Sequence, residues 1–254
     1  MPDSSMSDSE LKEFLEEKYL QFNRPEFIET DPIQIPHLFS AKQDIEIAAF
    51  LSATIAWGQR KTIIKNAKRI VDIMGGNPYE FICNAEDSDF EQFSDFKHRT
   101  FNGIDCIYFL KSLQNIYRNH GGLAMIFERK YQEKQSLKDA IIRFREIFFE
   151  LPCLARTRKH VANIEKQSAA KRLNMFLMWM IRKDTRGVHF GIWKNISPAD
   201  LFIPIDVHCG RTARKLGLLK RKQNDWKAVI ELTNRLKSFD PNDPVKYDFA
   251  LFNE

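Results

Sequence analysis

The sequence has only four cysteines, and no two of them form a CxxC pair. A zinc or iron–sulfur site usually needs cysteines that are close in the chain, so neither kind of site is predicted. We expect no metal and no other cofactor. The four side chains are expected to be reduced thiols, most of them buried: Cys83, Cys106, Cys153 and Cys209.

Long apolar runs are also missing. No window approaches the roughly 18 apolar residues of a membrane-spanning helix, and the first 30 positions contain neither a basic leader nor an apolar secretory segment. We therefore expect a cytoplasmic protein that does not enter the membrane. Runs of Val, Ile and Thr with a period of two do not occur either, so strands should be few, and no internal repeat is evident.

Apolar residues recur with helical spacing along most of the chain, whose 43% hydrophobic content is enough for a substantial core. The pattern predicts an all-α fold that forms a single unit over residues 1–254. A chain of this length can bury its core in one large domain or in two small lobes that share a cleft. For two lobes, the boundary is expected near residue 150, with the first helix packed on either lobe. The predicted helices cover 7–24, 44–56, 61–74, 104–117, 137–149, 169–181, 204–216 and 225–237, followed by a short helix at the end.

Positive charge is concentrated in the second half of the chain. Residues 151–237 contain 19 Lys and Arg against 6 Asp and Glu, a net charge of +13, although the whole chain carries only +5. Such a segment is typical of a solvated helical surface, and the other interpretation is a surface that neutralises phosphates. Charge alone leaves both open.

Lys171 opens a predicted helix whose following residues are nearly all apolar. An amine beside an apolar wall is partly desolvated, which favours its neutral, nucleophilic form. A lysine at the start of a helix is ordinarily a solvated side chain, so this position becomes informative only if it has a partner.

The candidate partner is Asp206, which follows the apolar residues Phe-Ile-Pro-Ile and precedes the helix expected from Val207. One interpretation is that the carboxylate caps that helix. The other is that it stabilises cationic character on a sugar, as the breaking of a glycosidic bond requires.

These two segments resemble the helix-hairpin-helix DNA glycosylase superfamily. Its bifunctional members carry a nucleophilic lysine, followed downstream by an Ile/Val-Asp-Thr-His-like segment with an essential aspartate. Lys171 falls at the lysine, and Pro204-Ile-Asp-Val-His208 is similar to the second segment. Residues 44–61 look like the superfamily's early buried helix and the turn behind it. The resemblance implies a two-lobed glycosylase fold, double-stranded DNA with a damaged base as the partner, and Lys171 and Asp206 as catalytic residues.

The sequence also departs from that pattern. The superfamily's hairpin usually reads like Leu-Pro-Gly-x-Gly, whereas residues 165–170 contain no glycine, so the hairpin should be altered or lost. The 34 residues between Lys171 and Asp206 exceed the endonuclease III spacing, and the excess falls in a loop at 185–199. This spacing is more similar to the archaeal 8-oxoguanine glycosylase branch. A bacterial family related to that branch, without an established substrate, resembles the chain more closely through the segments at 171–174, 204–208 and 246–252.

Further residues are implied to contact DNA. Basic side chains near the two segments are candidates for phosphate contacts, and aromatic side chains for stacking on a flipped base. A packed or hydrogen-bonded imidazole is the simplest interpretation of His208, because no second metal ligand lies at the right spacing. The candidate DNA contacts are Trp57, Gln59, Arg60, Lys61, Arg172, His208, Arg211, Arg214 and Lys215, with Phe101, Trp179 and Trp193 as further aromatic candidates.

The expected function is therefore base-excision repair by a monomeric, nucleoid-associated DNA glycosylase. It would act on an oxidised purine such as 8-oxoguanine, with or without abasic-site lyase activity. One alternative is a non-catalytic nucleic-acid-binding protein that retains the glycosylase fold. Another is a helical scaffold whose basic face binds an acidic protein.

Overall fold

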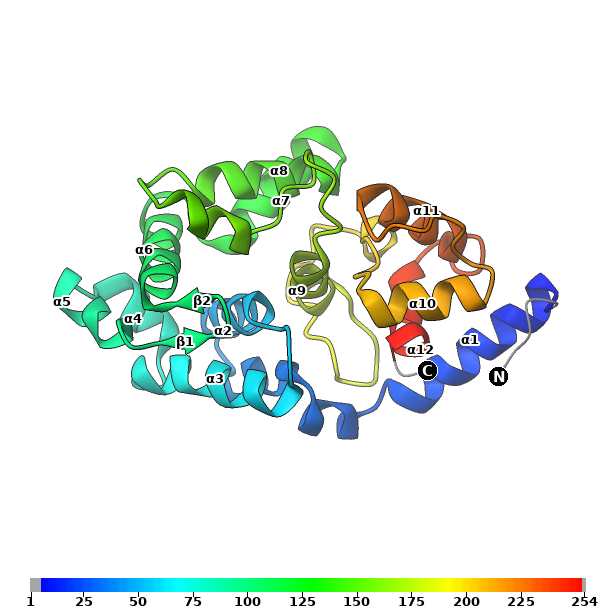
Figure 1. The fold of residues 1–254 in the computed structure, drawn as a ribbon, viewed down its shortest axis with the longest axis horizontal. Helices are drawn as coiled ribbons and strands as arrows, with labels where there is room; N and C mark the ends of the chain where they lie inside the picture. Colours follow the sequence, from blue (N-terminus) through cyan, green and yellow to red (C-terminus); the bar gives the residue numbers. More distant parts are fainter. Residues whose placement is uncertain (1–5, 253–254) are drawn as a thin grey trace. The chain divides into compact units, whose positions relative to one another are not determined.

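The computed structural model describes residues 6–252, which are predominantly helical (Figure 1). The chain divides into two compact units. The middle unit comprises Glu29–Ala162, and the C-terminal unit combines the residues up to Ile28 with those from Asn163 onward. The division expected near residue 150 thus lies after Ala162, and the first helix belongs to the C-terminal unit. None of the helices in residues 6–252 is long and apolar enough to cross a membrane.

The middle unit is built around one buried helix. The central helix α2 is buried from Ile45 to Thr54, a stretch in which only Glu46, Ser52 and Thr54 are polar. A two-residue hairpin, with Lys97 opposite Asn102, is the only sheet in the described part of the chain. The elements are α2 (Lys42–Thr54), α3 (Arg60–Ile73), α4 (Pro78–Asn84), α5 (Asp87–Phe90), β1 (Lys97–His98), β2 (Phe101–Asn102), α6 (Gly103–Asn119), α7 (Leu123–Lys134) and α8 (Leu137–Phe148).

Phenylalanine rings fill the core of this unit. Phe50 of α2 contacts Phe144 and Phe148 of α8 at centroid distances of 5.5 Å each, and Phe109 of α6 lies 4.7 Å from Phe148. Each buried ring stabilises the fold by about 2–3 kcal/mol. Gly103 allows α6 to start close to a neighbouring segment, because a Cβ there would lie 1.9 Å from the carbonyl oxygen of Ser94.

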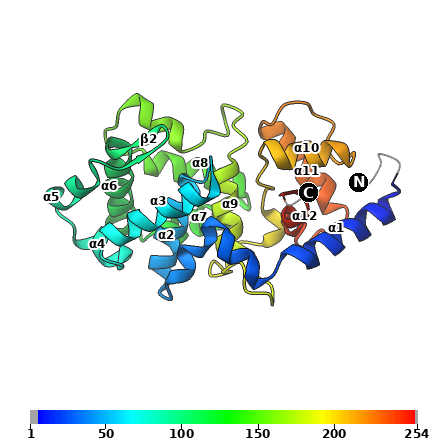
Figure 2. The same ribbon diagram turned by 60° about the horizontal axis from the view of Figure 1, so that its bottom comes forward.

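The C-terminal unit is assembled from both ends of the chain. Its helices are α1 (Asp8–Phe22), α9 (Lys171–Ile181), α10 (Val207–Lys215), α11 (Trp226–Lys237) and α12 (Asp248–Phe252). Helix α1 begins with a capping box between Ser7 and Glu10. The short α12 packs against both α1 and α10, and both views show it between them (Figures 1 and 2).

A buried arginine connects α1 to the rest of this unit. Arg182 is fully buried and binds Asp243, 2.9 Å from Nε, and Asp184, 2.8 Å from Nη1. Its Nη2 donates to the Tyr19 hydroxyl of α1 at 3.0 Å. Burial alone would raise the pKa of Asp184, but hydrogen bonds from the Arg186 backbone, Asn23 and Arg182 lower it to about 2. The network therefore joins α1 to the segment after α9, through Arg182 and Asp184, and to Asp243 near the end of the chain.

The loop expected at 185–199 lacks regular helix through Ser197, and only a short 3-10 turn follows at Pro198–Asp200. It is nevertheless well packed. The backbone N–H groups of Phe190 and Trp193 donate to the carbonyl oxygens of Trp179 and Met180, and Trp193 is fully buried. The insertion thus covers the C-terminal end of α9.

Candidate active site

Lys171 and Asp206 meet in the C-terminal unit. Lys171 is the first residue of α9 and Asp206 is the N-cap of α10. Lys171 Nζ lies 3.8 Å from Asp206 Oδ2, and about a quarter of each side chain is exposed, 24% and 26%. No other carboxylate in residues 6–252 pairs with Lys171. The two residues thus form a partly exposed ion pair between the starts of two helices.

The two oxygens of Asp206 have different partners. Oδ1 accepts hydrogen bonds from the backbone N–H groups of His208 and Cys209, both at 2.9 Å, so the predicted helix cap is confirmed. Oδ2 faces Lys171. The residues before Asp206 are buried, and the Ile203 N–H donates to Thr233 Oγ1 at 3.1 Å, which anchors the approach to α11. The carboxylate can therefore cap α10 and oppose a positive charge at once.

The turn before Lys171 has left-handed backbone despite its lack of glycine. Gln167 and Ala170 have φ values of 63° and 49°. These are conformations that glycine adopts readily and that cost other residues about 1–2 kcal/mol. Asn174, buried in the first turn of α9, donates from Nδ2 to the Ala169 carbonyl at 3.2 Å. The glycines are absent, but the left-handed conformations they would permit are present.

A short segment at 224–226 holds the starts of α9 and α10 together. The Trp226 N–H donates to the Gln167 carbonyl at 3.0 Å, and Ser168 pairs with Asp225 in an antiparallel bridge. Asn224 Nδ2 donates to the Asp206 carbonyl at 2.9 Å. This segment therefore fixes both backbones that carry the ion pair. Sequence reasoning missed Asn224, because nothing in a polar loop indicates which distant carbonyl an amide will reach.

Arg214 is part of the protein's own hydrogen-bond network. Its guanidinium donates to the carbonyl oxygens of Gly210 and Arg221, at 2.9 and 2.8 Å, and to Asn224 Oδ1 at 2.6 Å. A Cβ on Gly210 would lie 2.6 Å from that same amide oxygen, so the close approach needs glycine. Arg214, predicted as a phosphate contact, therefore mainly holds the loop after α10.

The other candidates of this unit differ in exposure. Arg211, Lys215 and His208 are exposed, so the imidazole at 208 is not packed in the core. Arg172 is only partly exposed, and burial lowers its pKa to about 10. It still carries a positive charge near neutral pH. Three of the four thus present charged or polar groups to solvent beside the pair.

The remaining candidates lie in the middle unit. Trp57 is half-buried, with its ring edge-on to His98 at 4.9 Å and stacked on His160 at 6.1 Å. Gln59, Arg60 and Lys61 are exposed at the start of α3. The three further aromatic candidates, Phe101, Trp179 and Trp193, are core residues with at most 2% of their surface exposed. The prediction that they contact a base is therefore wrong.

All four thiols are free; Cys106 and Cys209 are buried, whereas Cys83 and Cys153 are half-buried. Burial raises the pKa of Cys209, the third residue of α10 after its N-cap Asp206. No group of three or more His, Cys, Asp or Glu side chains in the described residues is arranged to hold a metal ion.

Fold and site together define a predominantly helical protein with a lysine–aspartate pair at the starts of two helices. A family model matches residues 31–254, and the chain belongs to that family, which is described as a protein of unknown function, DUF2400. No curated protein and no solved structure matches the chain significantly. An assignment of function therefore depends on the geometry of the site.

Proposed function

We propose that the chain is a DNA glycosylase that removes a damaged base, an oxidised purine such as 8-oxoguanine, from double-stranded DNA. The observation that carries the proposal is the 3.8 Å separation of Lys171 Nζ and Asp206 Oδ2 in a partly exposed site. An amine beside a carboxylate is suited to nucleophilic attack on a carbon that becomes positively charged. The basic residues around the pair suit a phosphate-bearing substrate.

In this proposal the damaged nucleotide first leaves the base stack, because its sugar carbon is inaccessible inside a duplex. Lys171, after losing its ammonium proton to solvent, forms a bond from Nζ to C1′. The bond from C1′ to the base breaks, and the base departs with the electron pair and takes up a proton. The Asp206 carboxylate stabilises the positive charge that develops on the sugar.

Lyase activity would follow from the same covalent intermediate. After attack, Nζ carries two protons and gives up one of them to solvent. Opening of the C1′–O4′ bond, with protonation of O4′, then gives a protonated Schiff base between C1′ and Nζ. Removal of a C2′ proton then expels the 3′-phosphate with the electrons of the C3′–O3′ bond. Water hydrolyses the C=N bond and restores Lys171.

Borohydride trapping tests the proposal, because it reduces the C=N bond to a stable amine. Wild type should form a covalent adduct with a duplex that contains 8-oxoguanine or an abasic site. Lys171→Gln should form none, and Lys166→Gln, the same change at an exposed lysine earlier in the segment, should trap like wild type.

The rival is a non-catalytic nucleic-acid-binding protein. For such a protein, wild type would bind the duplex but would neither trap nor release a base, even where a control glycosylase does both. A panel of duplexes, each with one lesion and scored for base release and strand nicking, extends the test to other damaged bases.

A further inference from the structure

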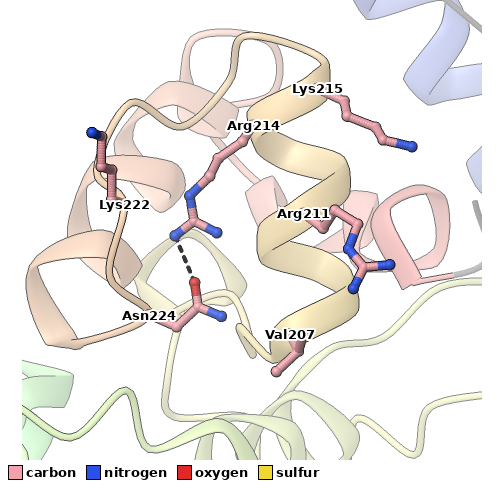
Figure 3. A pocket seen from close by; sticks show the side chains of 6 residues that line it. All are labelled: Val207, Arg211, Arg214, Lys215, Lys222 and Asn224. Carbon is pink, nitrogen blue, oxygen red and sulfur yellow. Dashed lines mark hydrogen bonds between the residues drawn. The ribbon is translucent and has the colours of Figure 1, made fainter.

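An open hollow lies beside the candidate active site, between α10 and the loop that follows it. We call it the α10 hollow. It measures about 660 Å³ and has no carboxylate in its lining, which is Val207, Arg211, Arg214, Lys215, Lys222 and Asn224. Figure 3 shows Arg211 and Lys215 extending from α10, Lys222 from the loop on the other side, and Arg214 turned toward Asn224 between them.

Three of its cations have no partner within the described residues. Arg211, Lys215 and Lys222 are exposed and form no ion pair or hydrogen bond there. Elsewhere in the chain exposed cations are often paired, for example Lys68 with Asp72. Unpaired like charges around one hollow repel each other, so a bound polyanion would stabilise their arrangement.

The surface around the hollow is also held in place. Arg214 ties the carbonyl oxygen of Arg221 to α10, and Arg221 in turn forms an ion pair with Asp225. The carboxylate of Glu231 accepts from the Lys220 N–H at 2.7 Å. The two arginines and the glutamate fix the loop from inside, so Lys222 projects from an ordered backbone. Little backbone entropy would therefore be lost on binding, although the three exposed side chains would still be ordered.

The hollow begins at the candidate active site. Val207, at its edge, directly follows Asp206 and is 64% exposed. Asn224, also in the lining, donates to the Asp206 carbonyl at 2.9 Å. From Val207 to Lys215 the helix rises by about 12 Å, the length of about three base-pair steps. A strand with one nucleotide at Asp206 could thus bring neighbouring phosphates to these cations.

We infer that the α10 hollow binds the phosphodiester backbone of the DNA strand next to the nucleotide held at Lys171 and Asp206. Arg211, Lys215 and Lys222 neutralise its phosphates, whereas Arg214 and Asn224 keep the hollow in shape. This inference rests on the proposed function for its choice of polyanion, but it can be tested without catalysis.

The experiment measures the affinity for an undamaged duplex between about 50 and 200 mM salt, with full-length protein. The test variant is the triple Arg211→Gln, Lys215→Gln, Lys222→Gln. The matched control is Lys12→Gln, Lys138→Gln, Lys194→Gln, three exposed cations of other elements that also have no partner in residues 6–252. Thermal unfolding of all three proteins checks that each is folded.

The test variant should lower the slope of log affinity against log salt by about 2 to 3, at about 0.9 for each lost phosphate contact. At about 0.1 M salt each contact corresponds to about eightfold in affinity, so binding should weaken by at least about 100-fold. The control should stay within about threefold of wild type.

Equal losses in both variants would mean that total charge alone matters and would overturn the inference. Absence of DNA binding by wild type would overturn it as well, and binding of an acidic polypeptide instead would identify a protein partner. If wild type traps on damaged DNA but the triple variant keeps the full salt slope, the inference that the α10 hollow binds DNA is refuted and the proposed function stands. If the triple variant lowers the salt slope but wild type forms no trapped adduct, the hollow binds DNA and the proposed glycosylase function is refuted.

Discussion

Replacing Asp206 separates its two roles. Asn can still accept the hydrogen bonds that cap α10, because it keeps one side-chain oxygen, whereas Ala cannot. We expect Asp206→Ala to lower the free energy of unfolding by about 1 kcal/mol, or Tm by about 2–4 °C. Asp206→Asn should lower the free energy of unfolding by only a few tenths of a kcal/mol, because Asn and Asp are comparable caps.

The charge has a separate effect, which both variants share. At 3.8 Å, two unit charges attract by about 1 kcal/mol in water and by about 4 kcal/mol at an effective dielectric constant near 20. The site is partly exposed, so the value lies between these limits. If the carboxylate stabilises a cationic sugar to this extent, Asp206→Asn slows base release by about 5-fold to 1000-fold.

The assay is base release in a single turnover, with enzyme in excess over a duplex that contains 8-oxoguanine, beside thermal unfolding of each variant. Ser136→Ala is the matched control, because it removes the N-cap of α8 and should cost a similar free energy without slowing base release. A wild-type rate for Asp206→Asn would refute the reasoning and would leave Asp206 as a cap.

Three further predictions follow from the same unit. Asn224→Ala should slow single-turnover base release by about tenfold, because it frees the Asp206 carbonyl and one end of Arg214, whereas Asn234→Ala, an exposed amide of α11, should not. Ala170→Gly should leave the free energy of unfolding in urea equal or up to about 1 kcal/mol higher, because it relieves the left-handed backbone at 170; Ala48→Gly, inside α2, should lower it by about 1 kcal/mol. Asp184→Asn should lower it by about 1–2 kcal/mol near neutral pH, after allowance for screening.

The pH dependence of the last variant has a definite sign. The folded-state pKa of Asp184, about 2, is below its ordinary value of 3.8. Its contribution is therefore fully present above about pH 4 and is lost as pH falls toward 2. Urea unfolding at several pH values should show the difference between wild type and Asp184→Asn shrinking in that interval. A difference that stays constant with pH would contradict the prediction for Asp184→Asn. An unchanged rate of base release would contradict the one for Asn224→Ala, and a clear loss of stability would contradict the one for Ala170→Gly.

Much of the helical structure could be predicted from the sequence, because periodicity and caps are local. Asp206 caps α10, as expected, and Ser7 caps α1. Three helices were missed, α4, α5 and α7, and for α4 and α7 the reason is local. Proline usually ends a helix, yet Pro78 is the first residue of α4, a position where its missing N–H costs nothing. In α7 most of the apolar residues fall in the first turns, so the segment lacks a long periodic stripe.

The pairing of Lys171 with Asp206 followed from a resemblance and not from periodicity, since 34 residues separate them. Their environment was beyond prediction. Whether Arg214 faces solvent or a carbonyl depends on where the loop at 219–225 folds back, and that is decided by tertiary contacts such as Asn224 with Asp206. Likewise, nothing local predicts that Trp193 lies in the core while Trp57 stays half-exposed.

Because helix α1 packs with α12, the C-terminal unit is not a continuous stretch of chain. The family match starts at residue 31 and so leaves out α1, which contributes Tyr19 and Asn23 to the network around Arg182. A fragment that starts at Asn163 would expose a buried guanidinium and an apolar face. Fusing residues 6–28 behind such a fragment, as a circular permutant, is the rearrangement through which the unit could be produced by itself.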